Sequence, residues 1–352
     1  MDIKELMKKV AVLLSGGVDS TASALILKDL GYEVVGVTLN ITDEAPKKAR
    51  KIAELIGIEH FVIEVRDEFE SLVIEPFIRW YSCGLTPNPC SLCNRRVKFG
   101  LAFERILEKF KVDLVATGHY VGKGIYKNHT LLREGLNKSK EQSYFLALIK
   151  KEVIQKVIFP LENKTKGEVI EFVRERLGLN FDSRGSQEIC FLEGKDIHQF
   201  IRDRIGGYPK GDIVYINEGK KIGEHKGIYN YTIGMRRFGI SLGKPLYVVK
   251  LDPKSNTVFV GDEDLLYKDE IQVRDLNLHL PIELWEDPHG RIRYRSEPIR
   301  IKDFKKEDGY YRVKFEKPVR APTPGQVLAI YEREYLIGGA IIYDPDLEYH
   351  PP

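Results

Sequence analysis

The stretch VAVLLSGGVDSTASALIL, residues 10–27, places a glycine-rich turn between a short apolar run and a segment of helix-forming residues. The apolar run predicts a buried strand over residues 10–15, and the next segment predicts a helix over residues 19–30 that ends at Gly31. A turn that leaves a strand and opens a helix offers free backbone N–H groups and the positive helix end to phosphate. The stretch therefore predicts a phosphate-binding loop near the start of an α/β fold.

The residues of this loop fit a nucleotide better than they fit an ordinary tight turn, which is the alternative. Ser15 and Ser20 supply hydroxyl donors, and Gly16 and Gly17 let the backbone approach an anion. Asp19 could hold the magnesium ion that accompanies a nucleotide. The string is not a Walker loop, because no Lys-Ser/Thr follows at the required spacing, and it is not a G-x-G-x-x-G turn.

Strand and helix signals alternate through the first half of the chain. This alternation predicts an α/β, doubly wound parallel sheet, in which ligands bind beyond the carboxyl ends of the strands. The further predicted strands are residues 33–39, 60–65 and 112–120, and the further predicted helices are residues 46–56, 67–80 and 96–110.

After about residue 200 the helix signals give way to short alternating strands with Gly and Pro turns. We expect a small, mainly-β central domain followed by a C-terminal β-barrel. Domain boundaries near residues 200 and 268 divide the chain into residues 1–199, 200–268 and 269–352. The predicted barrel strands include RIRYR (291–295), IRIKDF (299–304), YYRVKFE (310–316), VLAIYE (327–332) and YLIGGAIIY (335–343).

Charge and hydropathy indicate which partners and which cellular location to expect. The formal net charge of +3 over 352 residues is near neutral, so a polyanionic partner would have to meet a local basic patch. The longest apolar run near the N-terminus, residues 10–14, is too short for a signal-peptide core or a membrane span. We therefore expect a cytoplasmic protein with no membrane partner.

The four cysteines, Cys83, Cys90, Cys93 and Cys190, are more typical of reactive or metal-binding thiols than of a disulfide framework. The Cys90-x-x-Cys93 pair could be half of a structural zinc site, but a second Cys or His pair at short spacing is missing. Cys190 could be an inert buried thiol, yet polar residues flank it in GSQEICFLEG, residues 185–194.

Ordered blocks along almost the whole chain closely resemble the bacterial tRNA-specific 2-thiouridylases, a family of PP-loop ATP pyrophosphatases. The resemblance implies ATP-dependent adenylation of the 2-carbonyl oxygen of uridine 34, the wobble position of tRNA, followed by sulfur transfer. The blocks are SGGVDS (15–20), TPNPC-x-LCN with VKFG (86–100), ATGHY (116–120), KEQSYFL (140–146), ICF (189–191), G-x-H-x-G-x-x-NYTIG (223–234), RIRYR (291–295) and PGQ (324–326).

The family pattern implies a role for each matching residue, with ATP and Mg²⁺ as cofactors. Its implied partners are tRNA, with the Glu, Gln and Lys isoacceptors as the family expectation, and a sulfur-donor protein or sulfide. The reactive pair would be Cys93 and Cys190; ATP would be bound by Leu13, Leu14, Ser15, Gly16, Gly17, Val18, Asp19 and Ser20, with Leu39 and Gly118 beside the adenosine; the target base would meet Asn88, Pro89 and Cys90; and tRNA would be touched by His119, Lys140, Glu141, Gln142, Arg293, Tyr294 and Gln326.

The chemistry explains why these residue types are needed. The 2-carbonyl of uracil is a poor electrophile with a poor leaving group, so ATP first adenylates its oxygen and releases pyrophosphate, and sulfur then displaces AMP. In the family's usual account Cys190 carries a persulfide from a partner. Cys93 attacks that persulfide to liberate sulfide, or is left in a disulfide with Cys190.

Two positions depart from the family pattern. Many members carry Asp, often treated as a general base, where this chain has Cys90, and Met235 stands where Gln is usual. If Cys90, Cys93 and Cys190 converge, three thiolates could hold a four-iron four-sulfur cluster with one iron open to bind sulfide. Because thiols in a reducing cytosol favour soft metals, this cluster stands beside the persulfide relay as an alternative sulfur carrier.

A basic segment near the C-terminal end could meet the RNA backbone. Residues 289–306 contain seven Lys or Arg against two acidic residues. A strand there would place Arg291, Arg293 and Arg295 on one face, where they could contact phosphates. A solvated strand face is the alternative interpretation.

Two rival functions share part of this evidence. Another PP-loop ligase acting on a small molecule would have the loop but no need of Cys93, Cys190 or an RNA-binding β domain. A non-catalytic RNA-binding adaptor would not need an intact loop. Pyrophosphate release measured with and without unmodified tRNA separates the three functions.

Overall fold

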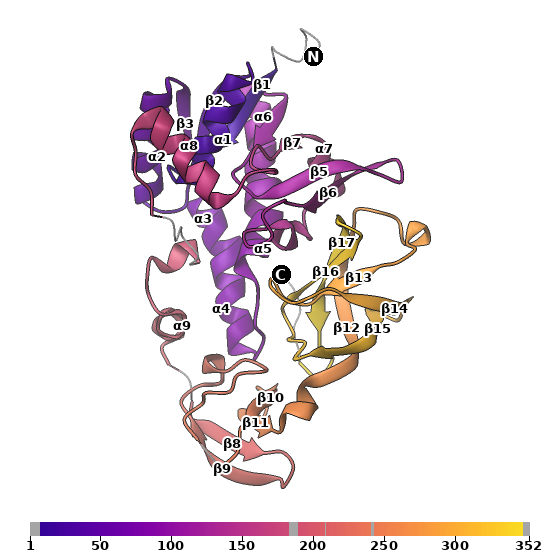
Figure 1. Cartoon of the computed structure of the whole chain (residues 1–352). Helices are drawn as coiled ribbons and strands as arrows, with labels where there is room; N and C mark the ends of the chain where they lie inside the picture. Colours follow the sequence, from indigo (N-terminus) through magenta and orange to yellow (C-terminus); the bar gives the residue numbers. More distant parts are fainter. Residues whose placement is uncertain (1–7, 183–188, 208, 241–242, 348–352) are drawn as a thin grey trace.

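Figure 1 shows an α/β unit built from the first half of the chain, a small β unit and a C-terminal β-barrel drawn in orange and yellow. The computed structural model describes residues 8–182, 189–207, 209–240 and 243–347, so residues 185–188 of the GSQEICFLEG block lie outside the described part. The fold class predicted from the sequence is confirmed.

The α/β unit is built on a parallel sheet with the strand order β3-β2-β1-β4-β7. From β1 (Lys9–Leu13) the chain moves outward through β2 and β3, and it then returns to the opposite side of β1 with β4 (Leu114–Ala116). The strand order therefore reverses between β1 and β4, which is where open α/β sheets form a ligand crevice. The predicted phosphate loop follows β1 directly and lies at this switch point.

Alternating side chains along β1 explain why helices cover both faces of the sheet. Val10, Val12 and Leu14 are buried in one apolar cluster with residues of α1, α2 and α8. Ala11 belongs to the other apolar cluster, which contains residues of the helices between β3 and β4.

Two long helical segments between β3 and β4 contain irregular turns. The predicted helix over residues 67–80 consists of α3 (Arg66–Phe69), the π-helical turn η1 (Glu70–Ile74) and α4 (Glu75–Ser82). The helix predicted over residues 96–110 is α5 (Pro89–Cys93), the π-helical turn η2 (Asn94–Leu101) and α6 (Ala102–Phe110), with non-helical backbone at Gly100. Such turns are frequent at functional sites.

The other elements of this half include a β-hairpin and two helices that the sequence analysis did not predict. The hairpin strands are β5 and β6, and the helices are α7 and α8. The bounds are α1 (Val18–Asp29), β2 (Glu33–Asn40), α2 (Glu44–Ile56), β3 (Glu59–Glu64), β5 (Val121–Tyr126), β6 (His129–Glu134), η3 (Ser143–Leu146), α7 (Lys151–Gln155), β7 (Val157–Ile158), α8 (Lys166–Leu177), η4 (Cys190–Leu192) and α9 (Ile197–Ile205).

The central β unit has the strand order β10-β11-β8-β9. Met235, where the resembling family usually has Gln, packs against its apolar core. The bounds are β8 (Gly211–Tyr215), β9 (Lys220–His225), η5 (Ile228–Asn230), β10 (Tyr247–Asp252), β11 (Thr257–Gly261) and η6 (Glu263–Leu266).

The C-terminal barrel closes because β17 pairs with both β16 and β12. Its strand order is β12-β15-β14-β13-β16-β17. The prediction that RIRYR forms a strand is wrong, because β13 ends at Arg291 and a turn follows, whereas the other predicted barrel strands are confirmed. The bounds are β12 (Tyr267–Leu278), η7 (Ile282–Leu284), β13 (His289–Arg291), β14 (Ile299–Lys306), β15 (Tyr311–Arg320), β16 (Val327–Glu332) and β17 (Tyr335–Tyr343).

Hydrogen bonds fix the barrel to the α/β unit. The hairpin strand β6 pairs with β17, with Leu132 opposite Leu336. Asn277 of β12 donates through Nδ2 to the carbonyl oxygens of Ala147 and Ile149 at 2.9 and 2.8 Å. The barrel therefore has a defined position relative to the loop that follows β1. In the described part of the chain, no helix has the length and apolar character needed to cross a bilayer.

Candidate active site

The predicted phosphate loop is shaped by a left-handed glycine and by bonds among its own residues. Gly16 has a φ of +78°, and a Cβ atom there would lie 2.7 Å from the Cβ atom of Lys48. Any side chain at this position would therefore be strained. Ser20 Oγ lies 3.2 Å from Ser15 Oγ and donates to the Gly17 carbonyl oxygen at 3.0 Å. These contacts order the loop before any ligand arrives.

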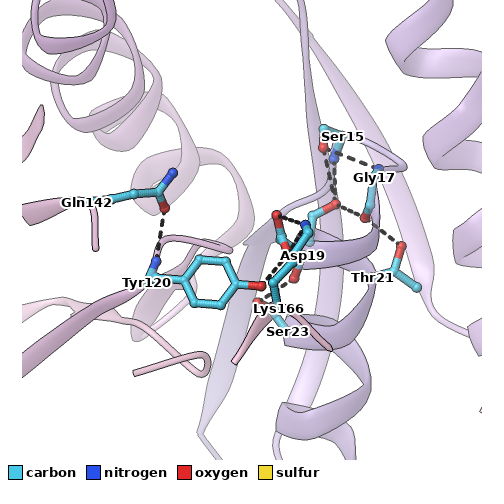
Figure 2. A network of polar contacts seen from close by, with 9 residues as sticks. Ser15, Gly17, Asp19, Thr21, Ser23, Tyr120, Gln142 and Lys166 are labelled. Atoms are coloured by element: carbon cyan, nitrogen blue, oxygen red, sulfur yellow. Dashed lines mark hydrogen bonds and ion pairs between the residues drawn. The ribbon is translucent and has the colours of Figure 1, made fainter. Parts of the chain in front are cut away.

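Asp19 is the most heavily bonded side chain of the loop region (Figure 2). Tyr120 donates its hydroxyl to Asp19 Oδ1 at 2.7 Å, and Lys166 Nζ lies 2.7 Å from both carboxylate oxygens. Gly118 leaves room for this approach, because a Cβ atom there would lie 2.8 Å from the Asp19 carbonyl carbon. Burial, followed by the Asp19 charge, raises the pKa of Tyr120, which keeps its hydroxyl protonated as the donor.

Three cavities meet at Asp19. The nucleoside cavity, about 320 Å³, lies over the ends of β1 and β2. The loop cavity, about 300 Å³, lies between the phosphate loop and Lys166. The thiol cavity, about 490 Å³, lies toward α5 and the barrel. The predicted ATP residues other than Gly16, which lines neither, divide between the first two. Leu13, Leu14, Ser15, Asp19, Ser20, Leu39 and Gly118 line the nucleoside cavity, and Gly17 and Val18 line the loop cavity with Ser15, Asp19 and Ser20.

The thiol cavity brings together the three cysteines that the sequence analysis singled out. Cys90 and Cys93 come from α5, and Cys190 comes from the start of η4. Cys93 is buried, whereas Cys90 and Cys190 are exposed. Pro89, predicted to meet the target base, also lines this cavity, but the Asn88 side chain caps α5 by accepting from the Ser91 N–H at 3.0 Å.

The half-buried Lys98 connects the thiol and nucleoside cavities because it lines both. Burial disfavours its charge, but the charges of Cys93, Cys190 and Cys90 outweigh burial and raise the pKa of Lys98. Burial raises the pKa of Cys93 to about 12, opposed by the Lys98 ammonium group. The pKa of His119, which lines both cavities too, falls to about 3 because of burial and then the Lys98 charge, so this imidazole is neutral at pH 7.

The described residues contain no group of three Cys, His, Asp or Glu side chains arranged to hold a metal ion. Cys90, Cys93 and Cys190 instead line one cavity together with the Lys98 side chain. The arrangement therefore does not fit the four-iron four-sulfur cluster that the sequence suggested.

The predicted tRNA residues fall into two groups. His119, Lys140, Gln142 and Tyr294 line the thiol cavity. In contrast, Glu141, Arg293 and Gln326 bond within the protein. Glu141 is buried and ion-pairs with Arg291 at 3.4 Å, and Gln326 donates to the Thr86 carbonyl oxygen at 2.7 Å.

The predicted ladder of three arginines on one strand face is wrong. Arg291 lies in β13 and pairs with Glu134 at 2.8 Å, and the half-buried Arg293 donates to the Ala321 carbonyl oxygen and, at 3.1 Å, to Thr323 Oγ1. Arg295 alone of the three is exposed, and it lines both the thiol cavity and an adjoining groove of about 760 Å³ beside the barrel. The turn after β13 separates the three side chains.

Sequence reasoning missed Tyr120, Lys98 and Lys166 as individual site residues. Tyr120 and Lys98 lie within the quoted blocks ATGHY and VKFG, which carried no assignment for them. Lys166 had a physical signal, because a cation in the first turn of a helix is disfavoured by the helix dipole and calls for a separate reason.

Comparison with known proteins identifies the class to which this loop, thiol pair and barrel belong. Family models described as tRNA methyl transferase HUP domain, tRNA methyl transferase PRC-barrel domain and Aminomethyltransferase beta-barrel domain match residues 8–194, 198–262 and 249–342. A protein of Aquifex aeolicus named tRNA-specific 2-thiouridylase MnmA is 42% identical over 95% of this chain and 98% of its own. One of the same name from Persephonella marina is 38% identical over 95% of this chain and 99% of its own.

The chain belongs to the family of bacterial tRNA-specific 2-thiouridylases. Among solved structures, a 4-thiouridine synthetase–RNA complex with bound ATP is 19% identical, with a TM-score of 0.32 over 48% of this chain and 40% of that chain.

Proposed function

We propose that this protein is an ATP-dependent tRNA 2-thiouridylase, which replaces the 2-carbonyl oxygen of uridine 34 with sulfur. One observation supports this function above all: the phosphate loop and the Cys93–Cys190 pair open into cavities that share Asp19, Lys98 and His119. Adenylation and sulfur attack can therefore act on one carbon atom of one bound base. The names of the full-length relatives agree with this chemistry.

The methyltransferase names of the family models have no counterpart in the site. A methyl transfer would need neither a loop for ATP phosphates nor a buried thiol beside an exposed one. A PP-loop ligase acting on a small molecule would explain the loop, but it would leave unexplained the groove of about 760 Å³ that adjoins the thiol cavity. The adaptor function would leave the ordered loop and the Asp19 network without a role.

In the first step ATP occupies the nucleoside cavity with its phosphates toward the loop. The uridine O2 atom forms a bond to the α-phosphorus, the bond from that phosphorus to the β-phosphate oxygen breaks, and pyrophosphate leaves. Mg²⁺ would be held by the Asp19 carboxylate, an oxygen donor of the kind this ion prefers, and would offset phosphate charge. Ser15, Ser20 and the first backbone N–H groups of α1 bind the phosphates.

In the second step a donor protein delivers sulfane sulfur to Cys190, whose exposure makes it the accessible member of the pair. The Cys93 thiolate attacks the Cys190 Sγ atom, which forms a Cys93–Cys190 disulfide and releases hydrosulfide into the thiol cavity. Hydrosulfide attacks the C2 atom of the adenylated base, and AMP leaves. A thiol reductant then reduces the disulfide.

We also propose a role for each domain and name the side chains that contact tRNA. Residues 1–199 carry the chemistry, residues 200–268 form the central domain, and residues 269–352 contribute the barrel that meets tRNA. Among the side chains that line the thiol cavity, Lys140, Tyr294 and Arg295 are best placed to contact the nucleotides next to the target uridine. Glu, Gln and Lys tRNAs are the proposed substrates.

The function is tested with purified protein, ATP, a persulfide donor and an unmodified glutamate tRNA transcript. We expect 2-thiouridine in the digested RNA and one pyrophosphate for each thiolation. A matched transcript with cytidine at position 34 should give neither product. Pyrophosphate release that needs no RNA, or that needs a small carboxylate, would instead support the small-molecule ligase.

The sulfur carrier is tested with Cys90→Ser. Because the relay uses only Cys93 and Cys190, this variant should retain thiolation with a persulfide donor and without iron. The control is wild-type protein prepared anaerobically and analysed for iron, sulfide and visible absorption. Loss of both iron and thiolation in the Cys90→Ser protein would replace the relay with a cluster.

A further inference from the structure

The loop cavity is the smallest of the three cavities that Asp19 lines. The role proposed for the phosphate loop does not explain why Lys166 lines this cavity as well. Ser15, Gly17, Val18 and Ser20 of the phosphate loop line one side. Lys166, from the first turn of α8, lines the other. The nucleoside cavity adjoins the loop cavity and shares Ser15, Asp19 and Ser20 with it.

This division matches the two halves of ATP after adenylation. The AMP half remains bonded to the base, so it must lie between the nucleoside cavity and the thiol cavity. The leaving half, pyrophosphate, needs a separate space on the far side of the α-phosphorus, because the bond forming to O2 and the bond breaking to pyrophosphate lie roughly in line. The loop cavity, which adjoins the nucleoside cavity at Ser15, Asp19 and Ser20, offers such a space.

To bind pyrophosphate, which is an anion, this cavity needs a cation among its lining residues. Asp19 lines it, and a carboxylate alone would repel a multiply charged anion. Among the residues that the structure describes, Lys166 is the cavity's only lysine, arginine or histidine. A Walker loop carries its lysine in the loop itself, whereas SGGVDS has none.

The Lys166 side chain is fixed by its contacts with Asp19 and by its place in the first turn of α8. It is 13% exposed, and its Nζ atom lies 2.7 Å from each Asp19 carboxylate oxygen, as Figure 2 shows. The capping box between Thr165 and Glu168 fixes the first turn of α8, so the Lys166 backbone has a defined position. An ammonium group has three donors and no acceptor, so it can bond to a phosphate oxygen while it remains paired with Asp19.

We propose that Lys166, the cation of the loop cavity, binds the leaving pyrophosphate directly beside the phosphate loop. The ammonium group offsets the charge that appears on the oxygen as its bond to the α-phosphorus breaks. In the nucleotide-free protein Lys166 neutralises Asp19, and on binding it contacts both. This assignment rests on the proposed adenylation and adds a binding residue to it.

The test is the binding of inorganic pyrophosphate, measured by titration calorimetry in Mg²⁺ and again in EDTA. Lys166→Gln should weaken pyrophosphate binding by about tenfold or more in both buffers, because one charge-assisted hydrogen bond is lost. AMP binding should stay within about twofold, since the nucleoside cavity is untouched. The matched control is Lys164→Gln, an exposed lysine two residues away, which should bind pyrophosphate like wild type.

Asp19→Asn separates direct binding from positioning of the aspartate. Without metal, this variant should bind pyrophosphate at least as well as wild type, because a repelling carboxylate is gone. If Lys166 acted only through Asp19, Lys166→Gln would lose affinity only in Mg²⁺, as Asp19→Asn does, and the proposal would be wrong.

Other results also overturn it. These are pyrophosphate affinity within twofold of wild type for Lys166→Gln in both buffers, and no binding by wild type in either buffer. Thermal melting of each variant excludes misfolding, and Lys166→Arg, which keeps the charge, should recover part of the affinity in a folded protein. Wild-type thiolation is measured in parallel. Its absence refutes the proposed function, whereas normal thiolation with unaltered pyrophosphate binding in Lys166→Gln refutes only the role of Lys166.

Discussion

The loop side and the thiol side of the candidate active site are built in opposite ways. On the loop side, charged groups are paired before any ligand binds: Asp19 accepts from Tyr120 and Lys166 at 2.7 Å. On the thiol side, the buried Cys93 is held as a neutral thiol, with its pKa raised to about 12 by burial and opposed by Lys98. The difference indicates that adenylation uses a preorganised electrostatic site, whereas sulfur transfer must first remove a proton.

The sharpest test of this comparison removes the thiol side alone. Cys190→Ser should lower 2-thiouridine formation by about a thousandfold or more, because the proposed sulfur carrier is lost. Pyrophosphate release with tRNA should persist within about threefold, since the loop side is intact. The two products are measured by mass spectrometry of digested tRNA and by a coupled pyrophosphate assay. A parallel loss of both would mean that the two sides do not act separately.

The complementary change removes the loop side. Asp19→Ala should lower pyrophosphate release by about a hundredfold to a thousandfold, because it removes a preorganised charge beside the phosphates and leaves Lys166 without its partner. Affinity for tRNA should stay within about twofold, since the barrel and the groove lie elsewhere. Filter binding measures that affinity. Weakened tRNA binding with normal pyrophosphate release would mean that Asp19 serves tRNA binding and not adenylation.

A smaller effect is expected from pH. Below its raised pKa, the thiolate fraction of Cys93 grows about tenfold per pH unit, so single-turnover sulfur transfer should rise from pH 7 to 9 while adenylation stays nearly flat. Lys98→Gln should lower sulfur transfer by about tenfold at pH 8, because the Lys98 charge favours the thiolate. Rapid-quench measurements of both steps check this. A flat sulfur-transfer profile would show that Cys93 is not the group that loses the proton.

The sequence predicts the parallel sheet and the loop well because both depend on local patterns. Alternation of Val10, Ala11 and Val12 decides which face each side chain covers, and Gly16 requires a left-handed backbone whatever surrounds it. The contacts that Lys166 and Tyr120 make with Asp19 could not be predicted, because these residues lie 147 and 101 positions away from Asp19 along the chain. Spacing in the sequence carries no information about such contacts.

The prediction that the basic segment forms one strand face was wrong for a related reason. Period-two spacing of Arg291, Arg293 and Arg295 predicts one strand face only if the strand continues, and β13 ends at Arg291. The burial of Arg291 beside Glu134 and Glu141 depends on how the barrel packs against the β5–β6 hairpin, which the sequence analysis did not predict. Three residues of one type thus have three different surroundings.

The last and smallest expected effect separates two of these arginines. Arg293→Ala should lower the free energy of unfolding by about 1–3 kcal/mol, because the Thr323 hydroxyl loses its donor and the Ala321 carbonyl oxygen keeps only Thr323 Oγ1 as a side-chain donor. Arg295 is exposed at the mouth of the thiol cavity, with its guanidinium 5.6 Å from the centre of the Tyr294 ring. Arg295→Ala should therefore change unfolding by less than about 0.5 kcal/mol and lower the log-log salt slope of tRNA binding by roughly 0.9 at most. Denaturant titration and binding between 50 and 200 mM salt (about the usual range for such slopes) measure the two quantities. If Arg293→Ala instead flattens the salt slope at unchanged stability, its guanidinium leaves the carbonyl groups and pairs with phosphate when tRNA binds.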